Sequence, residues 1–385
     1  MTQIPGKQNR TTQQISFLIR KRLVSLDVFR GIAIAFMILI GNLGGDANYM
    51  ILQHAEWNGL TLADIFFPFF LFIVGVAIPY SLSTRLEQGQ SKKKLLPRII
   101  RRAIVLFALG VFINGFPYFN LSTLRIMGVL QRIAICYLAA STAFLTLKKR
   151  KLILTTAFLL LLYWALMTIM PVPGYGPGAL DKNGNLAAYV DKLLLPGHLY
   201  LGGTWDPEGL LSTLPAIATT MLGVITAIFL RSDRSSKEKS TRLLLFGVLM
   251  IFIGGTWNFS FPINKNLWTS SFVALTGGMA LIVFSLCYYT VDFKRYSWWT
   301  KPFIILGLNA ITAYVLTEIM NLTLIYTNTT LYDGTTISIK GLIYQRYFAS
   351  WAGPLNGSLL YGLAYLLLWM GIMTILYKRR IFIKV

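Results

Sequence analysis

The sequence predicts an all-α integral membrane protein, a bundle of about ten transmembrane helices with both termini in the cytoplasm. Hydrophobic residues make up 55% of the 385 residues and charged residues only 13%, whereas a soluble domain usually carries about 25% charged residues. The apolar residues form long runs, and the Lys and Arg residues lie in short clusters between them. These patterns are typical of helices that cross a bilayer.

Ten runs approach the length of about 20 mostly apolar residues that a spanning helix needs. In chain order they are 28–45, 61–84, 99–116, 124–147, 152–171, 209–231, 242–260, 266–291, 301–327 and 357–377. The first run follows a basic segment without a small-residue cleavage site, so we expect a retained helix rather than a signal peptide. A basic cytoplasmic tail over 1–22 would then precede a single membrane domain over 23–385.

The basic clusters predict the orientation of the bundle. They precede the first run, follow the last one and occupy every second connection, at 20–22, 85–98, 148–151, 231–242, 294–301 and 378–380. Because positively charged loops remain in the cytoplasm, these connections and both termini are expected there. The net charge of +22 therefore indicates membrane orientation and a lipid bilayer as partner, with no nucleic acid.

Two long loops are expected on the opposite face, near 172–208 and 328–356. The first contains the glycine-rich stretch Gly174-Tyr175-Gly176-Pro177-Gly178. Because this stretch follows no predicted strand and opens no helix, it is not a dinucleotide-binding fingerprint. We expect turn-rich loops that cover a site open to the outside.

His54 is one of two histidines, and it lies in a polar window between the first two apolar runs, with Asn58 and Asp64 close by in sequence. Imidazole is the side chain whose ordinary pKa is closest to neutrality, so it can both accept and give a proton. His54 is therefore a candidate catalytic base. An interfacial histidine that caps a helix or binds a backbone carbonyl is the alternative.

Further polar residues fall within or beside the apolar runs, mostly toward the outer face. Ionisable groups are costly in a bilayer and usually mark a polar interior. Arg125 and Arg132 are seven residues apart and are expected on nearly the same helix face. The others are Asn42, Asp206, Glu208, Asn264, Lys265 and Glu318.

Structural ion pairs between helices, Arg132 with Asp64 or Arg125 with Glu318, are the alternative to a functional site. At the cytoplasmic end of the first run, Asp27 and Arg30 fit an ordinary helix start, although Arg30 could also bind a phosphorylated ligand. The two cysteines lie inside apolar runs. We expect no metal site and no disulfide framework.

Six segments carry a resemblance to a known family. They are SLDVFRG at 25–31, Asn42, HAEWNGLTLAD at 54–64, RIMGVLQR at 125–132, DPEG at 206–209 and PINKNLW at 262–268. Together, and in this order, they resemble the heparan-α-glucosaminide N-acetyltransferase family over nearly the whole chain from about residue 22.

The resemblance implies that an acetyl group from cytoplasmic acetyl-CoA is transferred to the amine of a terminal glucosamine across the membrane. It places the active-site histidine at His54 and a neighbouring functional asparagine at Asn42. We expect no counterpart of the lumenal domain that precedes the bundle in the animal enzyme. The chain therefore resembles the shorter bacterial members, in a bacterial inner membrane, and its glycan acceptor need not be heparan.

This reading gives the residues roles in chemistry. His54 could remove the proton of the amine, Asn42 or Asn58 could stabilise the oxyanion, and Asp64 could hold the imidazole tautomer or pair with the amine. Acetyl-CoA as co-substrate and the acceptor would be bound by Asn58, Arg30, Arg125, Arg132, Asp206, Glu208, Asn264 and Lys265. The residues do not decide between an acetyl-histidine intermediate and direct transfer.

Two other functions fit the same pattern. A transporter of an amino sugar or of its acetylated form would also place polar groups inside a bundle. An O-acetyltransferase of a surface glycan would use the same histidine chemistry on a hydroxyl. Helix faces rich in small residues also allow a homodimer.

Overall fold

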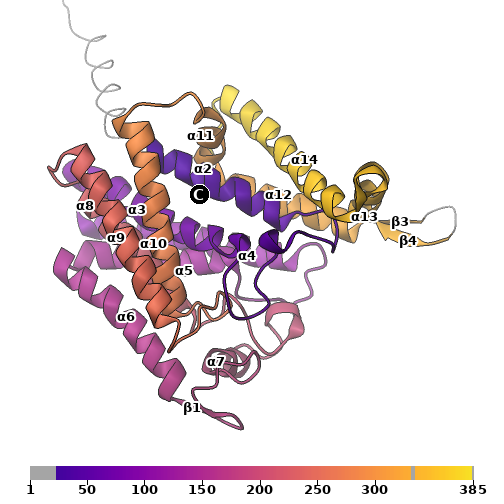
Figure 1. The fold of residues 1–385 in the computed structure, drawn as a ribbon, viewed down its shortest axis with the longest axis horizontal. Coiled ribbons are helices and arrows are strands. Elements are labelled where there is room, and N and C mark those ends of the chain that lie inside the picture. The colour runs from indigo at the N-terminus through magenta and orange to yellow at the C-terminus, as the bar shows by residue number, and fades with distance from the viewer. Residues whose placement is uncertain (1–22, 331–333, 384–385) are drawn as a thin grey trace, which may run out of the picture.

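A computed structural model describes residues 23–330 and 334–383 of the chain; the predicted tail over 1–22 lies outside them. The described residues are mostly helical, with two short two-stranded sheets (Figure 1). The α-helices are α2 (Val24–Gly41), α3 (Phe66–Glu87), α4 (Lys92–Gly115), α5 (Val129–Thr146), α6 (Lys149–Ile169), α7 (Leu186–Leu194), α8 (Thr213–Leu230), α9 (Ser236–Trp257), α10 (Ser270–Cys287), α11 (Lys301–Leu308), α12 (Ala310–Tyr326), α13 (Ile339–Tyr344) and α14 (Ser350–Lys378).

The predicted class, an all-α membrane protein, is confirmed, with slightly fewer candidate spans among the described residues than the ten runs of the sequence. Among the described residues, eight helices are long and apolar enough to cross a membrane, and a ninth span forms if α11 and α12, bent by 79°, are one broken helix. The one predicted span that is not among these nine is 99–116. It lies in α4, a helix whose first half carries Arg98, Arg101 and Arg102. These arginines make α4 the least apolar of the ten.

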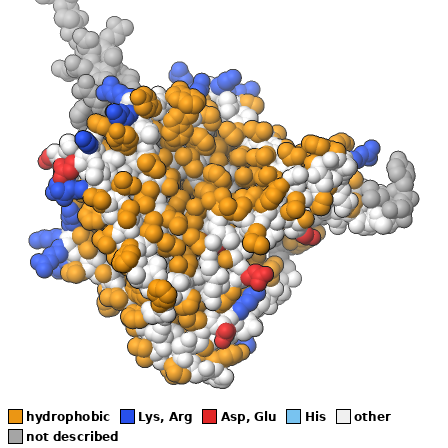
Figure 2. Space-filling view, in the orientation of Figure 1, with side chains coloured by type: hydrophobic (Ala, Val, Ile, Leu, Met, Phe, Trp, Pro, Cys, Tyr) orange, Lys and Arg blue, Asp and Glu red, His pale blue; other side chains and the backbone are white. Residues whose placement is uncertain are grey.

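Helix α3 lies at the centre of the bundle and packs against α2, α5, α8 and α10. It is apolar on all sides and largely buried, as expected of a helix surrounded by other helices. Helices α6, α9 and α14 lie at the periphery, where only a minority of their residues is buried and many apolar side chains are exposed. Figure 2 shows these hydrophobic side chains spread over a broad face, with Lys and Arg gathered along its upper and left margins.

Close backbone contacts between glycines hold the central helices together. A Cβ atom at Gly75 of α3 would lie 1.9 Å from the carbonyl oxygen of Thr220, and one at Gly223 of α8 would lie 2.0 Å from that of Phe72. Any side chain at either position would therefore force α3 and α8 apart. Small residues commonly permit such close packing of membrane helices.

Both expected outer loops contain regular structure. The segment over 172–208 holds a small hairpin of β1 (Pro171–Val172) and β2 (Gly176–Pro177), then α7, beyond the end of α6 (Figure 1). The segment over 328–356 is not a loop throughout: after the hairpin of β3 (Asn328–Thr330) and β4 (Thr336–Ser338) it continues as α13, a π-helical turn η5 (Gln345–Ala349) and the first residues of α14.

We expect Gly223→Ala to destabilise the protein by about 2 kcal/mol, because overpacking at a close helix contact typically costs 1–3 kcal/mol. The thermal unfolding midpoint in detergent measures this. Gly255→Ala in α9 is the control, since nothing lies within 4 Å of a Cβ there and alanine favours a helix. Equal midpoints for the two variants would contradict close α3–α8 packing.

Candidate active site

The carboxylate of Asp64 anchors the loop between α2 and α3. Asp64 is fully buried in the short helix η2 (Leu62–Asp64). Its Oδ2 accepts hydrogen bonds from the backbone N–H groups of Ala55 at 3.2 Å and Thr61 at 3.0 Å. These bonds fix the carboxylate and leave its Oδ1 oriented toward the ring of His54.

His54 lies 2.8 Å from this carboxylate, measured from Nδ1 to Oδ1. The side chain is 54% exposed, so the ring is held on one side and open on the other. With the Nδ1 proton donated to Asp64, the lone pair is on Nε2, because the partner of one ring nitrogen sets the tautomer of the other. The arrangement is that of a basic imidazole oriented by a buried carboxylate.

Lys265 completes this group from the loop between α9 and α10. Its Nζ lies 2.9 Å from Nδ1 and 3.2 Å from Nε2 of His54, and 3.6 Å from Oδ1 of Asp64. Burial lowers the pKa of Lys265, and the charge of Asp64 acts in the opposite direction. A lysine beside the two ring nitrogens can therefore share a proton with the histidine.

The α9–α10 loop is tied to the His54 loop at two points. Asn264 donates from Nδ2 to Oδ1 of Asn58 at 3.1 Å, and Gly59 donates its N–H to the carbonyl of Ile263 at 2.8 Å. The Oδ1 of Asn264 also accepts the N–H of Leu267 at 2.8 Å. These bonds set the position of Lys265, the residue after Asn264.

The two asparagines considered for an oxyanion differ in what they can offer. Asn58 is exposed, and its Oδ1 is already bonded to Asn264, so its Nδ2 is the atom left to donate. Buried Asn42 donates from Nδ2 to the carbonyl of Ile38 at 2.8 Å, and its Oδ1 has no partner among the described residues. Asn58 therefore suits the donor role better, and among the described residues no hydrogen bond joins Asn42 to His54.

Arg125 forms a second charged group with the segment that precedes α8. Its Nε lies 2.8 Å from Oδ2 of Asp206 and its Nη2 2.6 Å from Oδ1, and Nη2 also bonds Glu208. Burial lowers the pKa of Arg125, but the two carboxylates more than offset this and raise it above its ordinary value. Arg125 is therefore a permanent cation.

Arg132 lies in α5 and is fully buried. Its Nη2 donates to Oγ of Ser212 and to the carbonyl of Gly209 at 3.3 Å, and its guanidinium lies 5.0 Å from the ring centre of Trp268. Nε and Nη1 have no hydrogen-bond partner among the described residues. A buried guanidinium with unused donors is suited to an anionic ligand.

Two expectations about these arginines were wrong. Arg125 lies ahead of α5 rather than on it, so it shares no helix face with Arg132; both instead reach the segment 206–212. The alternative ion pairs are also not formed: Arg125 pairs with Asp206 and Glu208 rather than Glu318, and Arg132 does not pair with Asp64.

The two charged groups lie close enough to interact electrostatically. The charge on Lys265 is influenced by Glu208 and Arg132 as well as by Asp64. Arg30 does not belong to either group, because it lies near the opposite end of α2, where Nη1 is 3.4 Å from Asp27 and from the carbonyl of Gly307. Among the described residues, no group of three His, Cys, Asp or Glu side chains could hold a metal ion.

Asp191 of α7 is a buried carboxyl beside this site that the sequence did not single out. Its Oδ1 accepts the N–H of Leu210 at 2.8 Å. Burial, together with the nearby charge of Asp206, raises the pKa of Asp191 to about 7. Only its place in the stretch AYVDKLL, an acidic residue among apolar ones, could have indicated burial.

The raised pKa of Asp191 predicts a pH-dependent stability. Because the folded protein holds the Asp191 proton up to about pH 7 and the unfolded chain releases it near pH 4, the free energy of unfolding should fall as pH rises between these values. Asp191→Asn should remove up to about 4 kcal/mol of this dependence. Unfolding midpoints at pH 5 and pH 8 measure it.

The exposed Asp181→Asn in the same outer segment is the control and should behave as the parent protein does. Between pH 5 and pH 8, the unfolding midpoint of the parent protein should fall by more than that of Asp191→Asn. Equal changes in the two proteins would contradict the raised pKa of Asp191.

Comparison with known proteins gives consistent matches. The family model described as heparan-alpha-glucosaminide N-acetyltransferase, catalytic, matches residues 22–257, a range that includes His54, Asp64, Arg125 and Asp206. The chain is 32% identical over 356 residues to the heparan-alpha-glucosaminide N-acetyltransferase of Mus musculus, covering 78% of this chain and 54% of that protein. It is 31% identical to the Homo sapiens protein of the same name, covering 94% of this chain and 60% of that protein. The chain thus spans little more than half the length of these relatives.

Proposed function

Because the chain belongs to the heparan-α-glucosaminide N-acetyltransferase family, we propose that it transfers an acetyl group from acetyl-CoA to the amine of a glucosamine-type sugar. One observation carries the proposal beyond the family name. A half-exposed imidazole is held at 2.8 Å by a fully buried carboxylate, at the mouth of a membrane bundle. That geometry is suited to a general base that faces an entering substrate.

In the proposed reaction, Nε2 of His54 takes a proton from the attacking amine. The amine nitrogen forms a bond to the thioester carbonyl carbon, the carbon–sulfur bond breaks, and the thiolate leaves and is protonated. Asp64 stabilises the imidazolium that forms, as the carboxylate of a catalytic triad does. Lys265 lies beside both ring nitrogens; in this proposal it gives a proton to the leaving sulfur and takes one back from the imidazolium, which restores both groups.

Negative charge develops on the carbonyl oxygen of the acetyl group during this attack. The Nδ2 of Asn58 is the amide donor left available near His54, so we assign it the oxyanion. The Oδ1 of Asn42 has no hydrogen-bond partner among the described residues. We assign it to accept a hydrogen bond from the amine of the sugar. These proposed roles assign the two asparagines different functions.

The charged group around Arg125 and Arg132 serves in binding. The unused Nε and Nη1 of Arg132 are suited to a polar group of the acyl donor inside the bundle. Asp206 and Glu208 neutralise Arg125 and favour a cationic amino sugar at the entrance. Arg30, at the opposite end of α2, is placed for a phosphate of the donor on the basic side of the protein.

The charge pattern supports a proposal for the direction of transfer. Lys and Arg clusters occupy alternate connections, and His54 lies on the other side of the predicted bundle. We therefore propose that acetyl-CoA is supplied from the cytoplasm and that the acceptor is reached on the outer side of a bacterial inner membrane, within a single acyltransferase domain over 23–385.

We expect His54→Ala to reduce acetyl transfer by about 10²–10⁴-fold, because a positioned base contributes an effect of that size. Asp64→Asn should cause a similar loss, since it removes the charge that stabilises the imidazolium. The measurement uses the full chain in proteoliposomes, with radiolabelled acetyl-CoA and glucosamine. The matched control is His198→Asn, because the other histidine only bonds the carbonyl of Leu124 at 2.8 Å.

A set of different sugars, offered as acetyl acceptors, distinguishes an N-acetyltransferase from an O-acetyltransferase and from a transporter. Glucosamine should be labelled, and N-acetylglucosamine, whose amine is blocked, should not. Labelling of a hydroxyl sugar without an amine would indicate an O-acetyltransferase instead. Uptake of glucosamine that persists in His54→Ala, with no labelled product from any amine, would indicate a transporter and overturn the proposal.

A further inference from the structure

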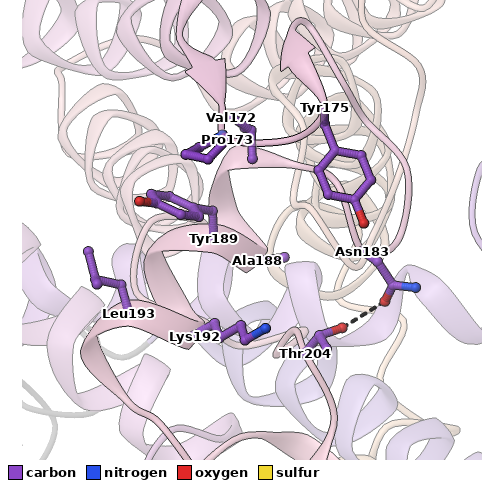
Figure 3. A pocket seen from close by; sticks show the side chains of 9 residues that line it. All are labelled: Val172, Pro173, Tyr175, Asn183, Ala188, Tyr189, Lys192, Leu193 and Thr204. Atoms are coloured by element: carbon purple, nitrogen blue, oxygen red, sulfur yellow. Dashed lines mark hydrogen bonds between the residues drawn. The ribbon is translucent and has the colours of Figure 1, made fainter.

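The outer segment between α6 and α8 contains a cavity of about 430 Å³ that the proposed chemistry does not use. It lies between the β1–β2 hairpin and α7 (Figure 3). Its size falls in the range of roughly 300–1,000 Å³ that is common for small-molecule sites. Aromatic and hydrogen-bonding side chains line it together, chiefly Tyr175, Tyr189, Asn183, Thr204 and Lys192.

The glycine-rich stretch over 174–178 builds one side of this cavity. Gly174 and Gly176 have φ values of +84° and +81°, which favour glycine, and they flank Tyr175 in the hairpin turn. The ring of Tyr175 lies against the backbone at Gly184, where a Cβ atom would approach Cδ1 to 2.4 Å. The sequence therefore fixes an aromatic ring that remains 56% exposed.

Helix α7 builds the other side. The Oδ1 of Asn185 caps its first turn by accepting the N–H of Ala188 at 2.8 Å, and the helix presents Tyr189 and, one turn later, Lys192. Figure 3 shows the two tyrosines on opposite sides of the cavity, with Lys192 below them. Among the described residues, the ammonium group of Lys192 has no hydrogen bond or ion pair.

Polar groups complete the lining. Thr204 donates from Oγ1 to Oδ1 of Asn183 at 2.7 Å, which leaves the Nδ2 of Asn183 available as a donor. Aromatic rings stack on the apolar faces of sugars, amides and hydroxyls bond sugar hydroxyls, and an ammonium group pairs with a carboxylate or sulfate. The lining combines all three, and Lys192 is its one formal charge.

The cavity is connected to the active-site loop through two tryptophans. Trp205 follows Thr204 and packs edge-on against Trp57, with ring centres 5.4 Å apart. Trp57 is three residues after His54 and donates from Nε1 to the carbonyl of Leu180 at 2.9 Å. On the other side of Trp205, Asp206 binds Arg125. The tryptophan pair thus links Thr204, which lines the cavity, to the loop that carries His54.

We propose that this cavity is a binding subsite for an acidic pyranose within the acceptor glycan, separate from the sugar that receives the acetyl group. The inference rests on the proposed function for the identity of the acceptor. Tyr175 and Tyr189 contact the sugar faces, Asn183 bonds a hydroxyl, and Lys192 pairs with the carboxylate or sulfate. The glycine-rich stretch over 174–178 forms the turn that holds Tyr175 at the cavity.

Binding is measured by calorimetry on the full chain in nanodiscs of neutral lipid. The probes are a tetrasaccharide of alternating glucosamine and glucuronic acid with a free terminal amine, a glucosamine tetrasaccharide without carboxylates, and glucosamine alone. Lys192→Ala should weaken binding of the acidic tetrasaccharide by about tenfold and leave glucosamine unchanged. Tyr175→Ala should weaken both tetrasaccharides about fivefold.

Two variants serve as controls. Tyr175→Phe keeps the ring and should bind as the parent protein does, which separates lost stacking from misfolding. Lys237→Ala removes the same charge from an exposed position at the start of α9 and should change nothing. In acetyl transfer, Lys192→Ala should raise KM for the acidic tetrasaccharide without altering kcat or the KM for glucosamine.

An acidic tetrasaccharide that binds the parent protein no more tightly than glucosamine, or equally to the parent and Lys192→Ala, would overturn the subsite. So would a Lys192 effect confined to vesicles that contain an anionic lipid, because the cavity would then bind a lipid headgroup. Absence of acetyl transfer to every sugar would instead overturn the proposed function. The calorimetric comparison still tests the subsite in that case, so the two failures are distinguishable.

Discussion

The buried carboxylate of Asp64 is the interaction on which the candidate site depends. A charge removed from water at the end of a membrane helix is stable only when its oxygens are fully satisfied. Backbone N–H groups of the loop ahead of α3 satisfy one oxygen, and His54 and Lys265 face the other. The same contacts that stabilise the charge fix the loop, orient the imidazole and draw the α9–α10 loop onto it.

The other charges beside the site follow the same rule. Arg125, Arg132 and Lys265 supply three positive charges, and Asp64, Asp206 and Glu208 supply three negative ones. The equal numbers of positive and negative side chains offset the cost of burying them. The hydrogen bonding is incomplete, however, because two N–H groups of Arg132 have no partner among the described residues. Buried donors without partners are uncommon in folded proteins and are consistent with a ligand-binding role.

Below this charged layer, the shape of the bundle is decided by backbone contact. Helices α3 and α8 touch at Gly75 and Gly223, and α2 meets α11 at Gly31 and Gly307 in the same way. Close packing of these helices brings the ends of α2, α3, α5, α8 and α10 to one face. The outer segment contacts the loop that carries His54 through the rings of Trp57 and Trp205.

Most of the helical segments and the conspicuous polar residues can be predicted from the sequence. All ten predicted runs lie in helical regions of the structure, because a bilayer requires long apolar segments with internally satisfied backbones. It also singled out His54 and Asp64, whose polarity is conspicuous between apolar runs. It overestimated the apolar character of α4, and it extended the fourth run back to Arg125, because helix ends leave a weak signal in a continuous apolar stretch.

Which of these residues come into contact depends on how the helices and loops pack together. Lys265 lies 211 positions after His54, and Arg125 finds its carboxylates 81 and 83 positions later, at Asp206 and Glu208, rather than at Glu318. Local pattern cannot show such partners, because it reports how polar each segment is but not which helix faces pack together. The glycine contacts that set the helix packing depend on both helices at once, and so does the geometry of the site.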